Sequence, residues 1–211
     1  LFLLRNPIDR ILSHYNWLRG QAAEELSFRK AICRDMHEEP VYTPIPPAII
    51  GYKSYFQWGL YYKWLVPFYE NFGKDSILIL TSEQLKNKPQ ETLDKCTAFL
   101  GLLSFHFDFS QQLNISTSVK FPNIFRLISY QRASAIPVIG WIIRKFPKSS
   151  KMHLSYKRAS FTEYYKSRFS IYSRYQMSLE ERIWLKSLYE EDVSNLKKLT
   201  DMSFGWPEDF E

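Results

Sequence analysis

The sequence predicts an α/β domain built on a parallel β-sheet. Two apolar runs, residues 1–4 and 76–80, are each followed by a turn and a segment with helical spacing. This order of strand, helix, strand and helix is typical of parallel sheets, and continuous apolar runs indicate strands covered on both faces. The 211 residues, 45% of them hydrophobic, are sufficient for one compact core, so we expect a single domain over residues 1–211.

The first strand leads directly into a helix. Asn6 is a favoured N-cap residue, and Pro7 suits the first position of a helix. The apolar positions that follow have helical spacing: Ile8, Ile11, Leu12, Tyr15 and Leu18. Gly20 is expected to end this helix.

The other elements follow from apolar spacing and from glycine and proline. We expect helices over residues 26–36, 52–72, 89–101 and 179–199, and a loop over residues 39–47, which hold four prolines. Gly73 should end the second of these helices, and Pro89 should begin the third. After residue 101 no further strand is expected, so the C-terminal part is predicted to be rich in helices.

Composition argues against a metal site and a membrane span. Cys33 and Cys96 form no CxxC pair. We interpret them as buried small residues of a reducing compartment, with a single disulfide as the alternative. Four scattered histidines do not predict a zinc site. No apolar stretch approaches the roughly 20 residues that span a bilayer.

The turn after the first strand is a candidate anion site. Ligands of parallel sheets bind beyond the carboxyl ends of the strands, where Arg5 stands, and the following helix directs its free N–H groups to the same place. A phosphate there could bind the Arg5 guanidinium and the hydroxyl of Ser13, on the polar face of the helix. The alternative is that Arg5 pairs with a carboxylate such as Glu83 while Ser13 faces solvent.

The segment that contains these residues resembles a known motif. Residues 3–15 read LLRNPIDRILSHY. They are similar to the 3′-phosphate-binding segment of sulfotransferases that use 3′-phosphoadenosine 5′-phosphosulfate (PAPS), and most similar to the glycan-modifying and bacterial members. Further resemblance lies, in the expected order, in residues 59–68, 77–85, 99–102 and 185–206.

The resemblance implies a fold, a donor and a reaction. The fold would be a P-loop-NTPase-like parallel sheet flanked by helices, with a helix-rich C-terminal part. Arg5 and Ser13 would hold the 3′-phosphate of PAPS. The reaction would transfer a sulfuryl group to a hydroxyl or amine of an acceptor, which the closest-looking relatives suggest is a carbohydrate. No metal is implied.

One part of the family pattern has no counterpart in these residues. Family members carry an earlier strand, glycine-containing loop and helix that bind the 5′-phosphosulfate and supply the catalytic lysine. The seven glycines here form no such loop. We therefore expect the catalytic residues upstream of Leu1 and no turnover by residues 1–211 alone; PAPS-dependent transfer by these residues would refute this.

Two residues carry open alternatives. Glu83 follows the second strand and is interpreted as a structural acceptor for backbone N–H groups or an arginine, with a catalytic role as the alternative. Lys120 lies where relatives place a loop over the nucleotide, which makes it a candidate donor contact; the alternative is an ordinary solvated lysine.

Positive charge is concentrated in one region. Residues 120–174 hold twelve Lys or Arg and one acid, Glu163. We predict a basic aromatic helical region over residues 120–175 that governs acceptor choice. Within it, residues 136–148, bounded by Ile136 and Lys148, suit an anionic membrane surface, a cleft for an acidic glycan, or an amphipathic helix packed on the sheet.

The charge also allows a second class of function. A non-catalytic module could bind nucleic acid through the basic aromatic region, but no motif of a nucleic-acid-binding fold is present, so nucleic acid is not the expected partner. A family member kept as a membrane-associated scaffold is a third possibility. The cysteine pattern favours a bacterial cytoplasm, with membrane association as an option; a eukaryotic protein of this type would belong to the Golgi lumen.

Overall fold

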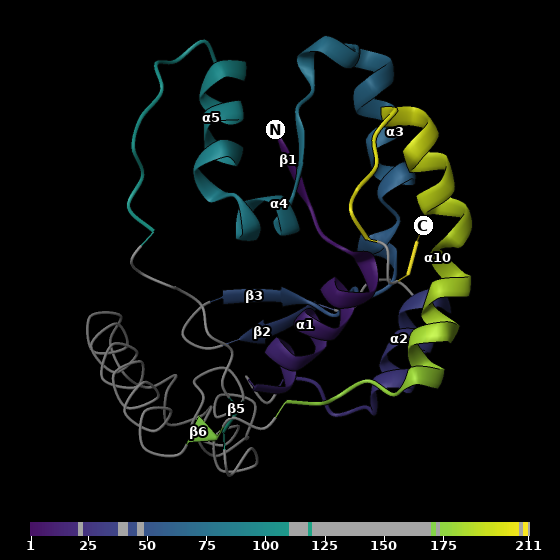
Figure 1. The fold of residues 1–211 in the computed structure, drawn as a ribbon. Coiled ribbons are helices and arrows are strands. Elements are labelled where there is room, and N and C mark those ends of the chain that lie inside the picture. Colours follow the sequence, from purple (N-terminus) through teal and green to yellow (C-terminus); the bar gives the residue numbers. More distant parts are fainter. Residues whose placement is uncertain are drawn as a thin grey trace, which may run out of the picture. The chain divides into compact units, whose positions relative to one another are not determined.

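The computed structural model of the chain divides into two compact units, each of which is described by itself. Unit 1 comprises Leu1–Ile11, Gln57–Ile115 and Met177–Glu211, and unit 2 comprises Leu12–Phe56 and Ser116–Gln176. The structure describes residues 1–20, 23–37, 42–45, 49–109, 118–119, 170–171, 174–206 and 209–210. Figure 1 labels their helices and strands.

Unit 1 contains the parallel strand pair that the sequence predicts. β1 (Phe2–Leu4) lies parallel to β4 (Ile79–Thr81), with Leu4 opposite Thr81. All of β4 is buried, as expected for a covered strand. The burial expected for the first apolar run is wrong at Leu3, which is 56% exposed in the described part of the chain. Both strands end at the same edge of the sheet, so the residues that follow them are neighbours.

α1 (Pro7–Gly20) begins after β1 and runs from unit 1 into unit 2. Asn6 is its N-cap, because the Oδ1 atom accepts a hydrogen bond from the N–H of Ile8 at 2.9 Å. The residues of its apolar face are fully buried: Ile8, Ile11, Tyr15 and Leu18. The predicted cap, first-turn proline and apolar stripe are confirmed.

In unit 1, α3 (Tyr61–Phe72) packs along α10 (Leu179–Thr200), and Figure 1 shows the two helices side by side. Asp192 of α10 accepts hydrogen bonds from the N–H of Tyr62 at 3.1 Å and of Lys63 at 3.3 Å. A carboxylate of one helix thus satisfies the N–H groups that the first turn of the other leaves unpaired. Burial raises the pKa of Asp192, and these N–H groups partly oppose that shift.

Two glycines define the start and the end of α3. Gly59 belongs to the short helix η1 (Gln57–Gly59), and a Cβ atom there would lie within 2.8 Å of the Cζ atom of Tyr189. Any larger residue at this position would force the buried Tyr189 of α10 to shift. Gly73 ends the helix, as predicted, with φ of 73°, a left-handed conformation that favours glycine.

α4 (Ser82–Asn87) and α5 (Pro89–Phe99) follow β4. Thr81 and Gln84 form a capping box, in which each side chain accepts a hydrogen bond from the other residue's N–H, at 3.1 and 3.0 Å. Pro89 begins α5, as predicted. The capping box fixes the direction in which the chain leaves β4.

Unit 2 contains α2 (Phe28–His37) and two antiparallel strand pairs. β2 (Tyr42–Ile45) pairs with β3 (Ile49–Tyr52), and β5 (Ser118–Val119) pairs with β6 (Ser170–Ile171). Aromatic rings with centroids 5.0 to 6.0 Å apart form part of its core: Tyr15, Phe28, Tyr55 and Tyr175. Such edge-on and stacked contacts stabilise the unit beyond simple burial.

Several predicted elements were wrong in detail. Residues 42–45 form β2 rather than a loop, because a strand in a two-stranded pair keeps one unpaired edge and tolerates Pro44 there. The helix predicted over residues 52–72 begins only at Tyr61, after β3 and η1. The strand predicted over residues 76–80 begins at Ile79, after the short helix η2 (Lys74–Ser76). β5 and β6 were not expected, since two residues are too few to show a period.

The region predicted over residues 120–175 lies outside the described residues, except for 170–171 and 174–175. In the part that the structure describes, no helix combines the length and apolarity needed to cross a membrane. Cys33 and Cys96 are free thiols and are half-buried rather than buried.

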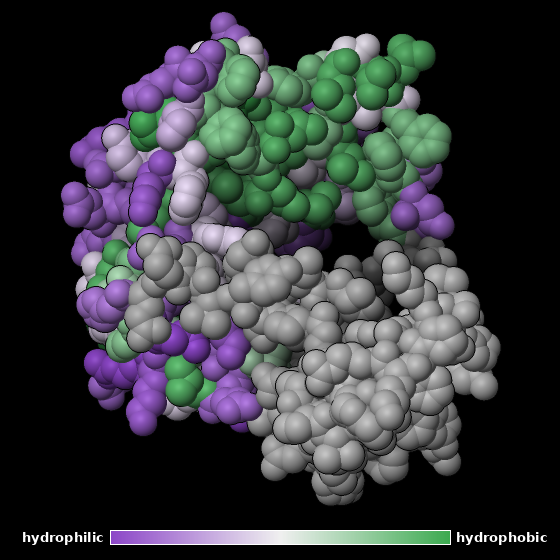
Figure 2. All heavy atoms as spheres, turned by 180° about the vertical axis from the view of Figure 1, so that it is seen from behind, coloured by the Kyte–Doolittle hydropathy of each residue, from purple (hydrophilic) through white to green (hydrophobic). Residues whose placement is uncertain are grey.

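Unit 1 also exposes large apolar side chains. They include Trp64, Phe68 and Phe72 of α3 and Leu103 and Phe105 after α5. Phe2 of β1 packs edge-on against Phe68, with ring centroids 5.0 Å apart. Figure 2 shows hydrophobic side chains gathered on the face of the described residues seen from behind.

We expect Asp192→Ala to lower the free energy of unfolding by about 1–2 kcal/mol, because two N–H groups at the start of α3 lose their acceptor. Chemical denaturation of the variant and the wild type measures the difference. The exposed neighbour Glu191 offers the control: Glu191→Ala should change stability by less than about 0.5 kcal/mol. Equal effects of the two substitutions would contradict the capping role.

Candidate functional site

The three residues that the sequence singles out lie in different parts of the chain. Arg5 belongs to unit 1 and follows β1, and its side chain is exposed. Ser13 belongs to unit 2 and is half-buried on α1. β1, which precedes Arg5, and α1, which carries Ser13, follow each other directly along the chain. Lys120 lies outside the described residues, so its role stays a prediction.

The peptide bond between Arg5 and Asn6 is held by side chains from other elements. The hydroxyl of Tyr61, in the first turn of α3, donates to the carbonyl oxygen of Arg5 at 2.9 Å. The N–H of Asn6 donates to Oε1 of Glu83 at 3.5 Å. The guanidinium of Arg5 itself forms no ion pair with the described residues. The alternative pair between Arg5 and Glu83 therefore does not occur among them.

Glu83 acts instead as a structural acceptor, as the sequence suggested. Besides the N–H of Asn6, it accepts hydrogen bonds from the indole Nε1 of Trp206 at 3.2 Å and from the hydroxyl of Ser82 at 3.1 Å. Trp206 is buried and stacks on Phe204, with ring centroids 4.8 Å apart. The end of β4 is thereby connected to the turn after β1 and to the C-terminal segment.

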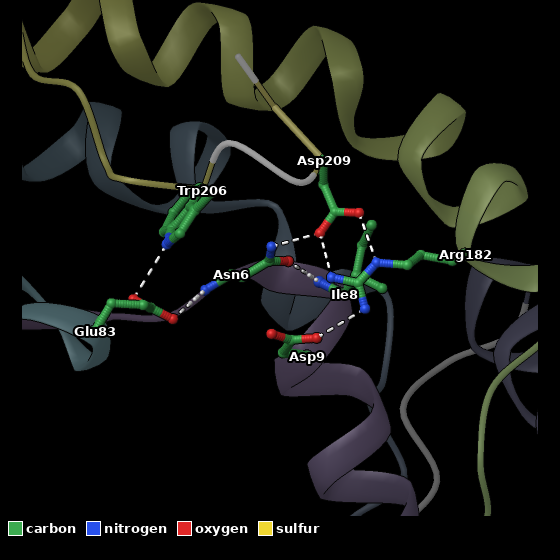
Figure 3. Close-up of polar contacts among 7 residues, drawn as sticks. All are labelled: Asn6, Ile8, Asp9, Glu83, Arg182, Trp206 and Asp209. Carbon is green, nitrogen blue, oxygen red and sulfur yellow. Dashed lines mark hydrogen bonds and ion pairs between the residues drawn. The ribbon is translucent and has the colours of Figure 1, made fainter. Parts of the chain in front are cut away.

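A second set of contacts holds the side chain of Asn6, and Figure 3 shows its members. The Nδ2 atom of Asn6 donates to Oδ2 of Asp209 at 2.6 Å, while Oδ1 caps α1. Asp209 also receives two hydrogen bonds from Arg182, Nε to Oδ1 at 2.7 Å and a terminal nitrogen to Oδ2 at 2.6 Å. The other terminal nitrogen of Arg182 pairs with Asp9 at 3.2 Å. Three segments therefore meet at this turn.

The buried carboxylate of this network has its counter-ion inside the network. Asp209 is 2% exposed, and a carboxylate at that depth requires a hydrogen-bonded cation. The hydrogen bond from Arg182 to Asp209 is the main cause that raises the pKa of Arg182, against the effect of burial. Arg182 thus supplies the counter-charge of the buried Asp209 and also pairs with Asp9. Arg5, by contrast, stays exposed beyond the carboxyl end of β1, where it can meet an external anion.

The polar face of α1 is used unevenly. Asp9 is paired with Arg182 within unit 1. Within unit 2, Asn16 exchanges two hydrogen bonds with the backbone of Tyr175, at 2.7 and 3.1 Å. The hydroxyl of Ser13 forms no hydrogen bond to any residue that the structure describes. Unlike Asp9 and Asn16, Ser13 therefore keeps its donor and acceptor available among the described residues.

Sequence reasoning missed the residues that hold the turn. Nothing in the spacing around Asp209, Arg182 or Tyr61 pointed to the turn, because each lies more than 50 residues away from it along the chain. The one usable signal was the tryptophan near the end of the chain, which resembled the family's closing tryptophan. That signal did not reveal its partner, Glu83.

A different buried cluster lies in unit 2 around Glu24, which is 4% exposed. The hydroxyl of Tyr55 donates to it at 2.6 Å, and the N–H groups of Glu25 and Leu26 donate at 2.9 and 3.0 Å. Two cations stand beside it, with Arg34 at 3.3 Å and Lys53 at 3.8 Å. These cations are already paired with Glu24, so they are poorer candidates for an external anion than Arg5.

These contacts decide the pKa of Glu24. Burial alone would raise the pKa, but the hydrogen bonds from Tyr55 and from the N–H of Leu26, with the charges of Lys53 and Arg34, lower it below the ordinary value of 4.5. Burial and the same hydrogen bond raise the pKa of Tyr55, which therefore stays protonated. In the described residues no group of His, Cys, Asp and Glu could hold a metal ion.

The fold and the turn define the class of the protein: an α/β protein with an exposed cation beyond the carboxyl end of a parallel strand. A sulfotransferase domain family matches residues 1–123, which is more than half of the chain. The chain therefore belongs to the sulfotransferase domain family, and the family expected from residues 3–15 is confirmed.

A solved structure has a similar fold. It is a sulfotransferase from Alicyclobacillus acidocaldarius, with a TM-score of 0.56 and 19% sequence identity. The match covers 95% of this chain and 53% of that chain, so the chain spans about half the length of the solved protein. At this identity the likeness shows the fold alone. No curated protein sequence matches the chain significantly.

We expect the Glu24 cluster to make stability depend on pH. Because its pKa is lowered in the folded state, its ionised form stabilises the fold above about pH 4.5, and this contribution is lost as pH falls through the folded pKa. At neutral pH Glu24→Gln should cost about 3 kcal/mol, since two cations lose their counter-charge. The difference from wild type should shrink in acid.

Urea unfolding at a series of pH values from neutral to about pH 3 measures this difference. Glu25→Gln, at the exposed neighbouring residue, is the matched control and should show little change at any pH. A difference between Glu24→Gln and wild type that stays constant over the whole range would contradict the linkage.

Proposed function

We propose that this chain forms the 3′-phosphate-binding part of a sulfotransferase that uses PAPS. The observation that carries the proposal is the exposed guanidinium of Arg5, which stands beyond the carboxyl end of β1 on a turn held by side chains from three segments. An exposed arginine at this position, with no ion pair among the described residues, suits a bidentate contact with a phosphate. Family membership supports the same reading, and we infer a P-loop-NTPase-like arrangement of the sheet.

Ser13 is assigned the second contact. Its hydroxyl has no partner among the described residues, so it can donate to a phosphate oxygen without breaking an internal hydrogen bond. Lys120 is assigned as a further donor contact. The proposal names no catalytic base or catalytic lysine within residues 1–211, and the expectation that these residues alone do not turn over stays a prediction.

The proposed reaction is the in-line transfer of a sulfuryl group. The bond between the sulfuryl sulfur and the bridging phosphate oxygen breaks, and a bond forms from the sulfur to a hydroxyl oxygen or amine nitrogen of the acceptor. A base takes the acceptor proton, and adenosine 3′,5′-bisphosphate leaves with the bridging oxygen. Residues Arg5 and Ser13 bind and orient the donor, far from the reacting sulfur, and no metal takes part in the proposal.

The acceptor is proposed to be a carbohydrate. The concentration of basic residues between 120 and 174 suits an acidic glycan, and we propose that residues 120–175 govern acceptor choice. Residues 136–148, from Ile136 to Lys148, could in addition contact an anionic membrane surface. Nucleic acid is not a proposed partner, and a bacterial cytoplasm remains the favoured compartment.

The donor site can be tested by calorimetry on the protein expressed from its natural start. We expect adenosine 3′,5′-bisphosphate to bind more tightly than AMP, which lacks the 3′-phosphate. Arg5→Ala should weaken the bisphosphate by about ten- to a hundredfold, since a charge-assisted bidentate contact is lost, and should leave AMP nearly unchanged. Ser13→Ala should have a smaller effect in the same direction.

Arg19→Ala removes an equally exposed arginine from the last turn of α1 and serves as the control, with no change in either affinity. If the folded wild type binds adenosine 3′,5′-bisphosphate and AMP equally well, the donor-site proposal is wrong. Preference for long oligonucleotides that vanishes steeply with salt would favour the basic module instead.

A further inference from the structure

The contacts of Asn6 suggest a second role for the C-terminal segment. Asn6 is 4% exposed, and its amide bridges two partners: Oδ1 caps α1, and Nδ2 donates to Asp209 at 2.6 Å. Its rotamer is therefore determined from both sides. Asn6 follows Arg5 directly, so the direction of the Arg5 backbone depends on where Asn6 is held.

Asp209 is in turn held by one residue. Arg182 binds both of its carboxylate oxygens, in the bidentate geometry that gives an ion pair both strength and direction. Arg182 lies in the first turn of α10, after the capping box of Ser178 and Glu181. Its remaining terminal nitrogen pairs with Asp9 of α1 at 3.2 Å, so it contacts the segment on the far side of Asn6 as well.

We propose that Asp209 and Arg182 are positioning residues for the donor phosphate: they hold the turn of Asn6 so that Arg5 is presented in its binding geometry. This inference rests on the proposed function. Neither residue is assigned a contact with the nucleotide. They act through Asn6. By holding the backbone at Arg5 before the nucleotide binds, they lower the conformational entropy that is lost on binding.

The geometry separates this role from simple stabilisation. The pair contacts the turn itself: its two partners there are Asn6 and Asp9, which both lie close to Arg5 along the chain. Tyr61 and Glu83 hold the carbonyl and the N–H of the peptide bond between Arg5 and Asn6. The exposed Arg5 therefore stands on a backbone that is held by several side chains.

The test is a double-mutant cycle on the protein expressed from its natural start. Asp209→Asn keeps the shape of the side chain but removes its charge. The dissociation constants of adenosine 3′,5′-bisphosphate and of AMP are measured for wild type, Asp209→Asn, Arg5→Ala and the double variant. The dissociation constant of AMP divided by that of the bisphosphate gives the preference for the 3′-phosphate. This ratio is insensitive to a uniform loss of active protein.

We expect Asp209→Asn to reduce this ratio about tenfold, the effect of losing one charged hydrogen bond. In the Arg5→Ala background the same substitution should have almost no further effect, because the residue through which it acts is absent. Thr200→Val, which removes a buried hydrogen bond at the other end of α10, is the control for lost stability and should leave the ratio unchanged.

The outcomes are distinct. If wild type prefers the bisphosphate and Arg5→Ala abolishes that preference, the donor site stands; an unchanged ratio in folded Asp209→Asn then overturns the positioning role. Additive effects in the double variant overturn it as well. If wild type shows no preference, the proposed function fails first, and the inference fails with it. Should Asp209→Asn not fold, Arg182→Lys keeps the charge, loses the bidentate fork and is expected to reduce the ratio in the same way.

Discussion

The hydrogen bonds of the Asn6 amide are the contacts on which the rest of unit 1 depends. The Oδ1 atom of the amide caps the start of α1, and its Nδ2 atom donates to the carboxylate of Asp209 near the end of the chain. Because an amide has both an acceptor and a donor, a single side chain can join a local helix cap to a long-range contact. The turn after β1 is thus specified by residues that lie about 200 positions apart.

Charge is distributed so that Arg5 pairs with no acid among the residues that the structure describes. Asp209 is buried and neutralised by Arg182, and Glu24 is buried and neutralised by Arg34 and Lys53. Burying these acids is possible only because each has a hydrogen-bonded partner. Arg5 stands in neither cluster and is exposed. The same rule that requires partners for buried charges identifies the exposed arginine as the group open to a ligand.

The sequence predicted the local elements around the site well and the distant ones less well. Asn6, Pro7 and the apolar stripe of α1 were predictable because a helix start depends on neighbouring residues. Residues 42–45 were misjudged, because whether a proline-containing segment forms a strand depends on a partner strand and not on the segment itself. The strands β5 and β6 carried no periodic signal because each has only two residues.

By itself, the sequence determined the α/β class, the placement of Arg5 at the end of a strand and the sulfotransferase family, because each of these is written in short, continuous runs of residues. The tertiary structure decided which acids pair with the arginines Arg5 and Arg182. It assigned Glu83 to Asn6 and Trp206 rather than to Arg5, and it assigned Arg182 to Asp209 and Asp9. Pairing between distant charges depends on which surfaces the packing of α10 and the C-terminal segment brings together, and no local pattern encodes that choice.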